Sequence, residues 1–238
     1  QLSSLEGFQL IDGIRAVGKP ILIMTGGEPL LRPDFFDLAN YAVKSGLRAV
    51  LATNGVLVTE AVAKELAKVG IPRASISIDG ASAADHDNFR KIPGAFEASL
   101  KGVEALKSAG IGVQINTTLT KRNRHQLSQI MKLAEEIGSV AFHVFLLVPT
   151  GRAKDMSGEE MGPEEYEETL LEFYSLGRKS KLETKATCAP QYYRIMRQQA
   201  AIDGLTVDEV NFGLNARTRG CLGGLSFCFV SHIGELQP

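Results

Sequence analysis

The five residues Thr25-Gly26-Gly27-Glu28-Pro29 join a short apolar run to an amphipathic segment. The apolar run, residues 21–24, has the composition of a buried strand, and residues 34–44 have the spacing of a helix. Two consecutive glycines let the backbone bend and approach a ligand, since neither carries a Cβ atom. These residues predict a strand, a glycine turn and a helix, with the Glu28 carboxylate placed to accept hydrogen bonds from a cationic group.

The same alternation of apolar runs and helical patterns continues along the chain. The expected strands are residues 20–24, 49–52, 74–78, 112–119 and 141–148. The expected helices are residues 5–16, 35–45, 59–69, 95–109 and 124–137, each ending near a glycine. This alternation predicts an α/β fold with parallel strands and right-handed crossovers. Five strands are visible, and one more strand before Leu5 would make six, which is an open or partial barrel.

The pattern changes near residue 155, where we place a domain boundary without a flexible linker. Beyond it we expect an acidic helix at 163–175, a second helix at 192–202 and a strand at 227–233 that enters a turn. The sequence therefore predicts an α/β domain over residues 1–155 and a smaller C-terminal region over residues 156–238. Both ends of the chain resemble the interior of a longer polypeptide.

Composition is that of a globular protein, with 44% hydrophobic and 22% charged residues. The net charge of −1 argues against a broad electrostatic attraction to nucleic acid or to an anionic membrane. Three cysteines, an odd number without an export signal, argue against a disulfide framework. A cytoplasmic location is the expectation, with neither nucleic acid nor a membrane as partner.

Polar residues gather where the expected strands end, which is the edge at which ligands bind in α/β folds. The glycine turn at such a strand end resembles the motif of the radical S-adenosylmethionine (SAM) superfamily. The resemblance implies a partial (β/α)6 TIM-like barrel, in which this turn holds the amino group of SAM, and places the first strand upstream of Gln1. The SAM site that it implies consists of Thr25, Gly26, Gly27, Glu28, Pro29, Thr53, Asn54, Ser77, Asp79, Asn116 and Arg152.

For two residues of this set, Asp79 and Arg152, the sequence also allows a role outside the SAM site. Ser77 and Asp79 are two residues apart on one expected strand, so both would face the ribose of SAM. Asp79 could instead start a turn before Gly80. Arg152 could pair with the carboxylate of SAM or of a substrate, or lie at the surface.

The family binds a [4Fe-4S] cluster through a CxxxCxxC loop, and the cluster delivers the electron that cleaves SAM to a 5′-deoxyadenosyl radical. No such motif exists in this sequence, whose cysteines are Cys188, Cys221 and Cys228. The loop could lie before Gln1, which the missing first strand favours, or the chain could be a cluster-free relative. The catalytic cluster ligands are therefore unknown from this sequence.

Glycine-rich backbone surrounds the pair Cys221 and Cys228, which suits an iron–sulfur cluster. Within the resemblance, these two and Cys188 match a SPASM- or Twitch-type auxiliary [4Fe-4S] site whose next cysteine would follow Pro238. Three buried thiols and a zinc site are the alternatives. Among the histidines, we expect His86 and His125 to lie at the surface. His143 lies on an expected strand and could face the barrel, and His232 is expected near the cysteines.

Segments outside the barrel resemble the tetrapyrrole-modifying branch of the superfamily, which acts in alternative heme biosynthesis and in the heme d1 pathway. These segments are residues 148–152, 187–194, 218–224 and 229–232. The resemblance implies oxidative decarboxylation of two Fe-coproporphyrin III propionates to vinyl groups, giving heme b. A ferredoxin or flavodoxin would donate electrons. Candidates for binding the porphyrin carboxylates are Arg194, Arg217, Arg219 and His232.

Three other functions remain open at this point. The chain could remove acetate side chains from 12,18-didecarboxysiroheme to give Fe-coproporphyrin III, or perform the equivalent heme d1 step. It could be a radical SAM peptide maturase with the same use of the C-terminal cysteines. It could also be a non-catalytic carrier of tetrapyrrole or iron that kept the fold.

Overall fold

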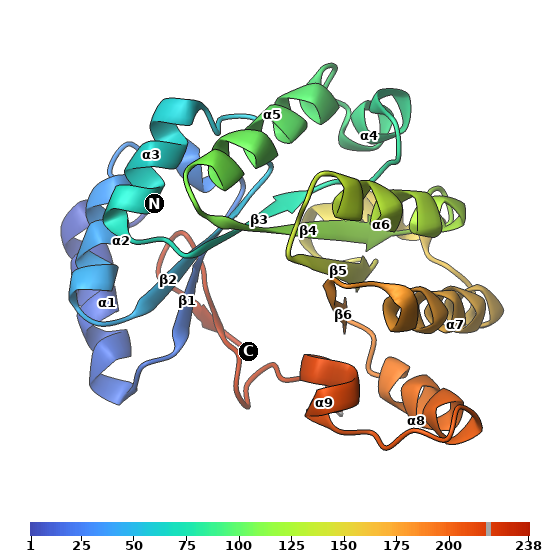
Figure 1. Ribbon diagram of the computed structural model, residues 1–238. Coiled ribbons are helices and arrows are strands. Elements are labelled where there is room, and N and C mark those ends of the chain that lie inside the picture. Colours follow the sequence, from blue (N-terminus) through green and yellow to red (C-terminus); the bar gives the residue numbers. More distant parts are fainter. Residues whose placement is uncertain (218–219) are drawn as a thin grey trace. The chain divides into compact units, whose positions relative to one another are not determined.

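The computed structural model describes residues 1–217 and 220–238, without the side chains of residues 152, 157, 209 and 214. In the described ranges, six strands form one sheet in the order β1-β2-β3-β4-β5-β6, and β7 and β8 form a separate hairpin (Figure 1). The chain divides into two compact units. The first comprises residues 1–77, 97–114 and 223–238, and the second comprises residues 78–96 and 115–222. The expected domain boundary near residue 155 stays a prediction.

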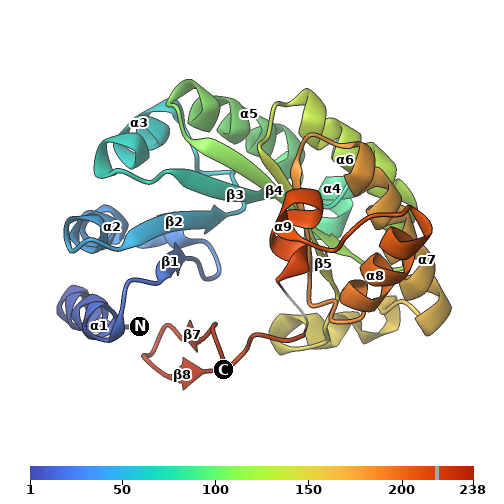
Figure 2. The same cartoon turned by 60° about the horizontal axis from the view of Figure 1, so that its bottom comes forward.

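The first unit is built on three parallel strands. These strands are β1 (Ile21–Met24), β2 (Arg48–Thr53) and β3 (Arg73–Ser77), with Ile21 opposite Arg48 and Leu51 opposite Ala74. The unit's other elements are α1 (Ser4–Val17), η1 (Pro29–Leu31), α2 (Phe35–Lys44), α3 (Glu60–Val69), most of α5 (Ala95–Ser108), β7 (Phe229–Val230) and β8 (Leu236–Gln237). Helix α1 packs against α2, which also contacts α3 and β2 (Figure 2).

Local sequence explains where these helices begin, end and pack. Ser3 and Glu6 form a capping box that satisfies free N–H groups at the start of α1. Gly70 ends α3 with a φ of +94°, a conformation that costs glycine little. Helix α5 can approach the loop after β2 because Gly102 has no side chain, and a Cβ there would lie 2.6 Å from the Gly55 carbonyl oxygen.

The second unit contains the end of β4 (Gly112–Leu119), and its strands β5 (Ala141–Leu146) and β6 (Glu183–Thr187) are parallel. Helices α6, α7 and α8 pack in sequence order, since α7 contacts both of the others (Figure 1). The bounds are α4 (Ala83–Arg90), η2 (Arg124–Gln126), α6 (Leu127–Glu136), η3 (Gly151–Glu159), α7 (Pro163–Lys179), α8 (Tyr192–Ile202), α9 (Glu209–Phe212) and η4 (Gly213–Ala216).

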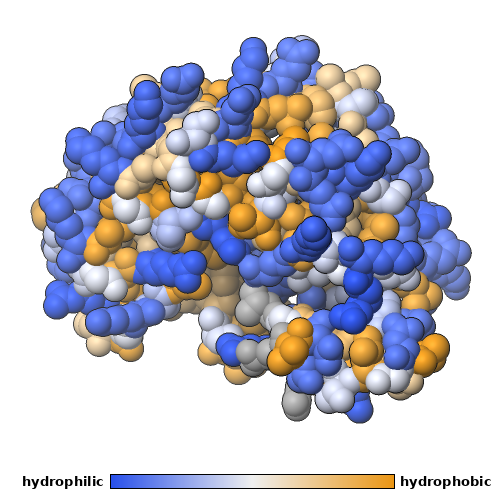
Figure 3. All heavy atoms as spheres, viewed as in Figure 1, coloured by the Kyte–Doolittle hydropathy of each residue, from blue (hydrophilic) through white to orange (hydrophobic). Residues whose placement is uncertain are grey.

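Apolar side chains form a core in each unit. In the first, Leu51, Leu66 and Ile76 are almost completely buried. In the second, Phe173 lies 6.5 Å from the ring of Phe142 and 5.5 Å from that of Tyr192, between centroids. Burial of such a side chain contributes about 1.5–3 kcal/mol relative to an exposed position. The outer faces of α2 and α3 carry mainly hydrophilic side chains (Figure 3), and no helix in the described ranges has the length and hydropathy needed to cross a bilayer.

The five expected strands are confirmed to within two residues at each end. The sheet also contains a further strand, β6, that was not predicted from the sequence. The β6 sequence is mostly polar and only Ala186 is buried, so it lacks the apolar signal of a central strand. A strand upstream of Gln1 stays a prediction. Helix α4 was missed for a similar reason, since His86 is its one buried residue among those that the structure describes.

Candidate functional site

The glycine turn after β1 places a carboxylate in a fixed position. Glu28 caps the N-terminus of η1, and its Oε1 accepts a hydrogen bond of 3.1 Å from the Leu30 N–H. The Thr53 hydroxyl donates to the same carboxylate at 2.8 and 2.9 Å, and the Asn54 N–H donates to Oε2 at 2.9 Å. These donors therefore hold the half-buried Glu28 carboxylate in one orientation at the strand ends.

The backbone before Glu28 is open on the side where a ligand could approach. An added Cβ at Gly26 or Gly27 would meet no atom within 4 Å, and both residues are exposed. Gly26 has a φ of +151°, which favours glycine. An exposed glycine backbone beside a fixed carboxylate is suited to a ligand ammonium group, so these residues fit the amino end of SAM.

The other expected SAM residues of the first unit follow the same strand ends. Thr53 is buried at the end of β2, where its hydroxyl also accepts from the Gly55 N–H at 3.1 Å. Pro29 is buried as the first residue of η1. Ser77 is half-buried and ends β3. Hydrogen bonds thus join Glu28 of the turn to Thr53 and Asn54, whereas the Ser77 side chain makes none within the described part of the chain.

In the second unit, Asp79 is buried and its carboxylate already has partners. Oδ2 forms an ion pair with the Arg90 Nε at 2.5 Å, and Oδ1 accepts from the Thr118 N–H at 2.7 Å. The Asn123 side chain donates to the Asp79 carbonyl at 2.9 Å. The expectation that Asp79 lies on the same strand as Ser77 was wrong, because β3 ends at Ser77. The ion pair had no sequence signal, since Arg90 lies on the unpredicted helix α4.

The Asp79 backbone N–H also donates to His86 Nδ1 at 3.0 Å. His86 is 1% exposed, so the expectation of a surface histidine was wrong. Burial lowers the pKa of His86 from its ordinary value of 6.5, although the nearby Asp79 charge opposes that shift. The imidazole therefore favours the neutral form, with Nδ1 as acceptor and the proton on Nε2.

The remaining sequence candidates are placed as follows. Asn116 is half-buried on β4, and its carbonyl accepts from the Ile78 N–H at 2.9 Å. His125 is exposed, as expected, and His143 is buried on β5. His232 is exposed, and its carbonyl accepts from the Leu2 N–H at 2.8 Å. The Arg152 side chain and the whole of Arg219 lie outside the described residues.

Cys188 has an unusual backbone, with a φ of +56° that is strained for a residue with a side chain. The residue is exposed, but the atoms around its sulfur partly desolvate the thiolate. This burial first, and electrostatic repulsion between the Cys188 and Cys221 thiolates second, raise the pKa of the Cys188 thiol. Cys228 is exposed and belongs to the first unit. Among the described residues, no three Cys, His, Asp or Glu side chains gather as a metal site.

Two of the arginines expected to bind substrate carboxylates lie among the described residues, and both are exposed. Arg194 pairs with Glu167 through both terminal nitrogens and donates to Gln198 at 2.8 Å, so its donor fork already has acceptors. Arg217 is exposed in the segment that follows η4.

The Radical SAM superfamily model matches residues 6–134, more than half of this 238-residue chain. The chain belongs to the radical SAM superfamily. Membership supports SAM and an iron–sulfur cluster as cofactors. A structural comparison bears on the fold alone: Streptococcus suis SuiB bound to its precursor peptide SuiA matches with a TM-score of 0.67 at 14% identity, covering 82% of this chain and 45% of SuiB. The expected α/β partial-barrel fold is confirmed.

Curated relatives confirm the resemblance to the tetrapyrrole-modifying branch. The AdoMet-dependent heme synthase of Oleidesulfovibrio alaskensis is 52% identical over the whole chain, which spans 61% of that relative. The enzyme of the same name from Methanosarcina barkeri is 50% identical, and the chain spans 68% of it. The Fe-coproporphyrin III synthase of M. barkeri is 38% identical over 69% of the chain and 41% of that relative.

Proposed function

We propose that this protein is a radical SAM enzyme of heme biosynthesis that converts Fe-coproporphyrin III to heme b. The observation that carries the proposal is the identity of 50–52% to AdoMet-dependent heme synthases over all 238 residues. The Fe-coproporphyrin III synthase is less similar: it is 38% identical to this chain, and the match covers 165 of the 238 residues. The similarity therefore favours heme formation over the preceding step.

The reaction has a simple balance. Each of two propionates loses one hydrogen atom, one carbon dioxide molecule and one electron, and a vinyl group remains. When bound, SAM supplies the carbon radical that abstracts hydrogen, after one electron from a reduced iron–sulfur cluster. The protein's own contribution is to hold SAM, to orient the porphyrin side chain and to exclude water.

The first unit would hold the methionine end of SAM. The Glu28 carboxylate would accept from the ammonium group, while Thr53 and Asn54 keep that carboxylate in place. The backbone at Gly26 and Gly27 leaves room for this approach. Ser77 and Asn116 would form hydrogen bonds with the ribose hydroxyls. Asp79 would hold the loop after β3 in place through its ion pair with Arg90.

The proposed function needs ligands for two iron–sulfur clusters, and this sequence contains candidates for only one of them. The CxxxCxxC ligands of the catalytic cluster are absent from the 238 residues, and we propose that the full-length protein supplies them. Cys188, Cys221 and Cys228 are the residues that would hold an auxiliary [4Fe-4S] cluster, and such a cluster would supply an electron acceptor, although these side chains do not gather as a metal site in the described residues. A ferredoxin or flavodoxin in the cytoplasm would be the external donor.

The test is anaerobic turnover by the reconstituted full-length protein with SAM, dithionite and Fe-coproporphyrin III. We expect heme b by liquid chromatography and mass spectrometry, with two SAM molecules cleaved per product. About eight irons per chain would support two clusters, and about four would remove the auxiliary one. Conversion of didecarboxysiroheme alone would assign the protein to the preceding step. Absence of SAM cleavage despite a bound cluster would contradict the enzyme proposal.

A further inference from the structure

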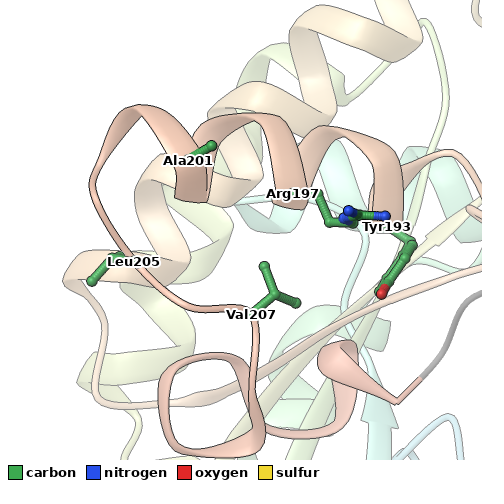
Figure 4. Close-up of a pocket in the computed structure, with 5 residues that line it drawn as sticks. All are labelled: Tyr193, Arg197, Ala201, Leu205 and Val207. Carbon is green, nitrogen blue, oxygen red and sulfur yellow. The ribbon is translucent and has the colours of Figure 1, made fainter.

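A hollow lies on one face of α8 in the second unit, the helix that also carries Arg194. Tyr193, Arg197 and Ala201 follow one another at intervals of four along that face, and Leu205 and Val207 complete the lining from the next segment (Figure 4). Its volume of about 440 Å³ lies within the range of small-ligand sites. The lining combines one cation and one phenol with three apolar side chains.

Arg197 is the distinctive residue of this hollow. Its guanidinium lies over the Tyr193 ring, with the central carbon 6.0 Å from the ring centroid (Figure 4). Within the described part of the second unit, Arg124 and Arg194 pair with glutamates, whereas Arg197 has no carboxylate within salt-bridge distance. Stacking on a ring orients the planar donor fork without occupying its N–H groups.

We propose that this hollow is a subsite for a propionate group of the tetrapyrrole substrate. The inference rests on the proposed function and adds a residue to it. The Arg197 fork binds the carboxylate with two parallel hydrogen bonds, which is the geometry that guanidinium and carboxylate share. Leu205 and Val207 contact the apolar edge of the macrocycle beside that carboxylate. The site thus recognises an anionic group of the substrate.

The experiment is an anaerobic absorbance titration of the reconstituted full-length enzyme with Fe-coproporphyrin III. We expect Arg197→Gln to weaken porphyrin binding about tenfold, since a hydrogen bond to a charged partner is worth about 1.5–3 kcal/mol before exposure reduces it. Arg197→Lys should recover part of this loss, because lysine keeps the charge without the fork. Tyr193→Phe should bind as the wild type does, and Tyr193→Leu should bind more weakly.

Lys179→Gln is the matched control, because it removes one exposed positive charge from α7 in the same unit. Its porphyrin affinity should stay within about twofold of the wild type, since an isolated surface charge contributes little. SAM affinity in each preparation reports whether the fold is intact. A parallel titration with the tetraamide of Fe-coproporphyrin III should show no difference between the wild type and Arg197→Gln.

Equal porphyrin binding by the wild type and Arg197→Gln would overturn the subsite, as would equal weakening by Lys179→Gln. Loss of SAM binding in Arg197→Gln would assign the side chain a structural role and also overturn it. If the wild type makes heme b while Arg197→Gln is unaffected, only the subsite fails. If the wild type neither binds nor converts the porphyrin, the proposed function fails together with the subsite.

Discussion

At the scale of single residues, the Glu28 carboxylate is the group on which cofactor binding should depend most. Glu28→Gln replaces one carboxylate oxygen by an NH2 group, which would face a backbone donor, either the Leu30 N–H or the Asn54 N–H. It also removes the charge that an ammonium group would contact. We expect SAM affinity to fall at least about tenfold, because hydrogen bonds between charged groups are worth about 1.5–3 kcal/mol.

Isothermal titration with SAM measures this effect. Glu60→Gln is the control, because it removes a carboxylate that is exposed at the start of α3 in the same unit. SAM binding by Glu28→Gln that equals that of the wild type would remove Glu28 from the site.

A second residue-scale prediction concerns the acid stability of the second unit. The pKa of buried His86 is lowered from 6.5, so the unfolded chain takes up a proton at a higher pH than the folded chain does. Stability should therefore fall as pH drops below about 6.5, by at most about 1.4 kcal/mol per pH unit, and level off below the folded-state pKa. His86→Asn keeps an acceptor for the Asp79 N–H but does not titrate, so its stability should fall less.

Urea unfolding at pH 7 and pH 5.5 compares the two proteins. The exposed His125, changed to Asn, should leave the wild-type pH dependence unchanged. An identical loss of stability in His86→Asn and the wild type would contradict the assignment of His86 as a buried neutral group.

At the scale of elements, β6 shows how side chains can complete a strand that has few apolar residues. The Asn215 side chain donates to the Thr184 carbonyl at 2.8 Å, and the Ala186 N–H donates to its Oδ1 at 3.4 Å. These bonds satisfy backbone groups of β6 from a residue in η4. We expect Asn215→Ala to destabilise the protein by about 1–3 kcal/mol, because it leaves the part-buried Thr184 carbonyl without its donor and the buried Ala186 N–H without its acceptor.

Urea unfolding again provides the measurement, with hydrogen exchange at Ala186 as the local readout. Asn211→Ala is the control, since its side chain donates to the Thr206 carbonyl in an exposed position and should cost less. Equal stabilities of the Asn215 and Asn211 variants would show that the side-chain bonds to β6 contribute nothing.

Elements with their own apolar signal could be predicted from sequence, and elements completed by distant residues could not. The strand at Gly112–Leu119 and the helix at Tyr192–Ile202 have the predicted bounds, because each buries one periodic face. Strand β6 and helix α4 were missed, since their stability depends on partners far away in sequence, such as Asn215 for β6 and Asp79 for the end of α4. Local patterns carry no information about such partners.

The same limit applies to the site. The bonds from Thr53 and Asn54 to Glu28 agree with the predicted turn, because all three residues follow strand ends that meet at one edge of the sheet. The buried ion pair of Asp79 was not predictable, since Asp79 before Gly80 has the same local signal in a ligand site and in a turn. Arg197 also had no signal, because only its lack of an acidic partner in the described residues distinguishes it from Arg194.

At the scale of the whole molecule, the expected SAM residues belong to both units, and each unit can be tested by itself. Hydrogen exchange with saturating SAM should slow in residues 25–30 and 53–56 of the first unit, and in residues 79–81 and 116–120 of the second. A ligand present at about a hundredfold its Kd stabilises the native state by about 2.7 kcal/mol, which is easily detected in exchange rates. Exchange in α7, where no SAM residue is expected, is the internal control. Protection confined to the first unit would leave Asp79 with a structural role through Arg90 and would remove Asn116 from the site. Absence of protection in the first unit would contradict the turn as the binding site for the amino group, whatever happens in the second.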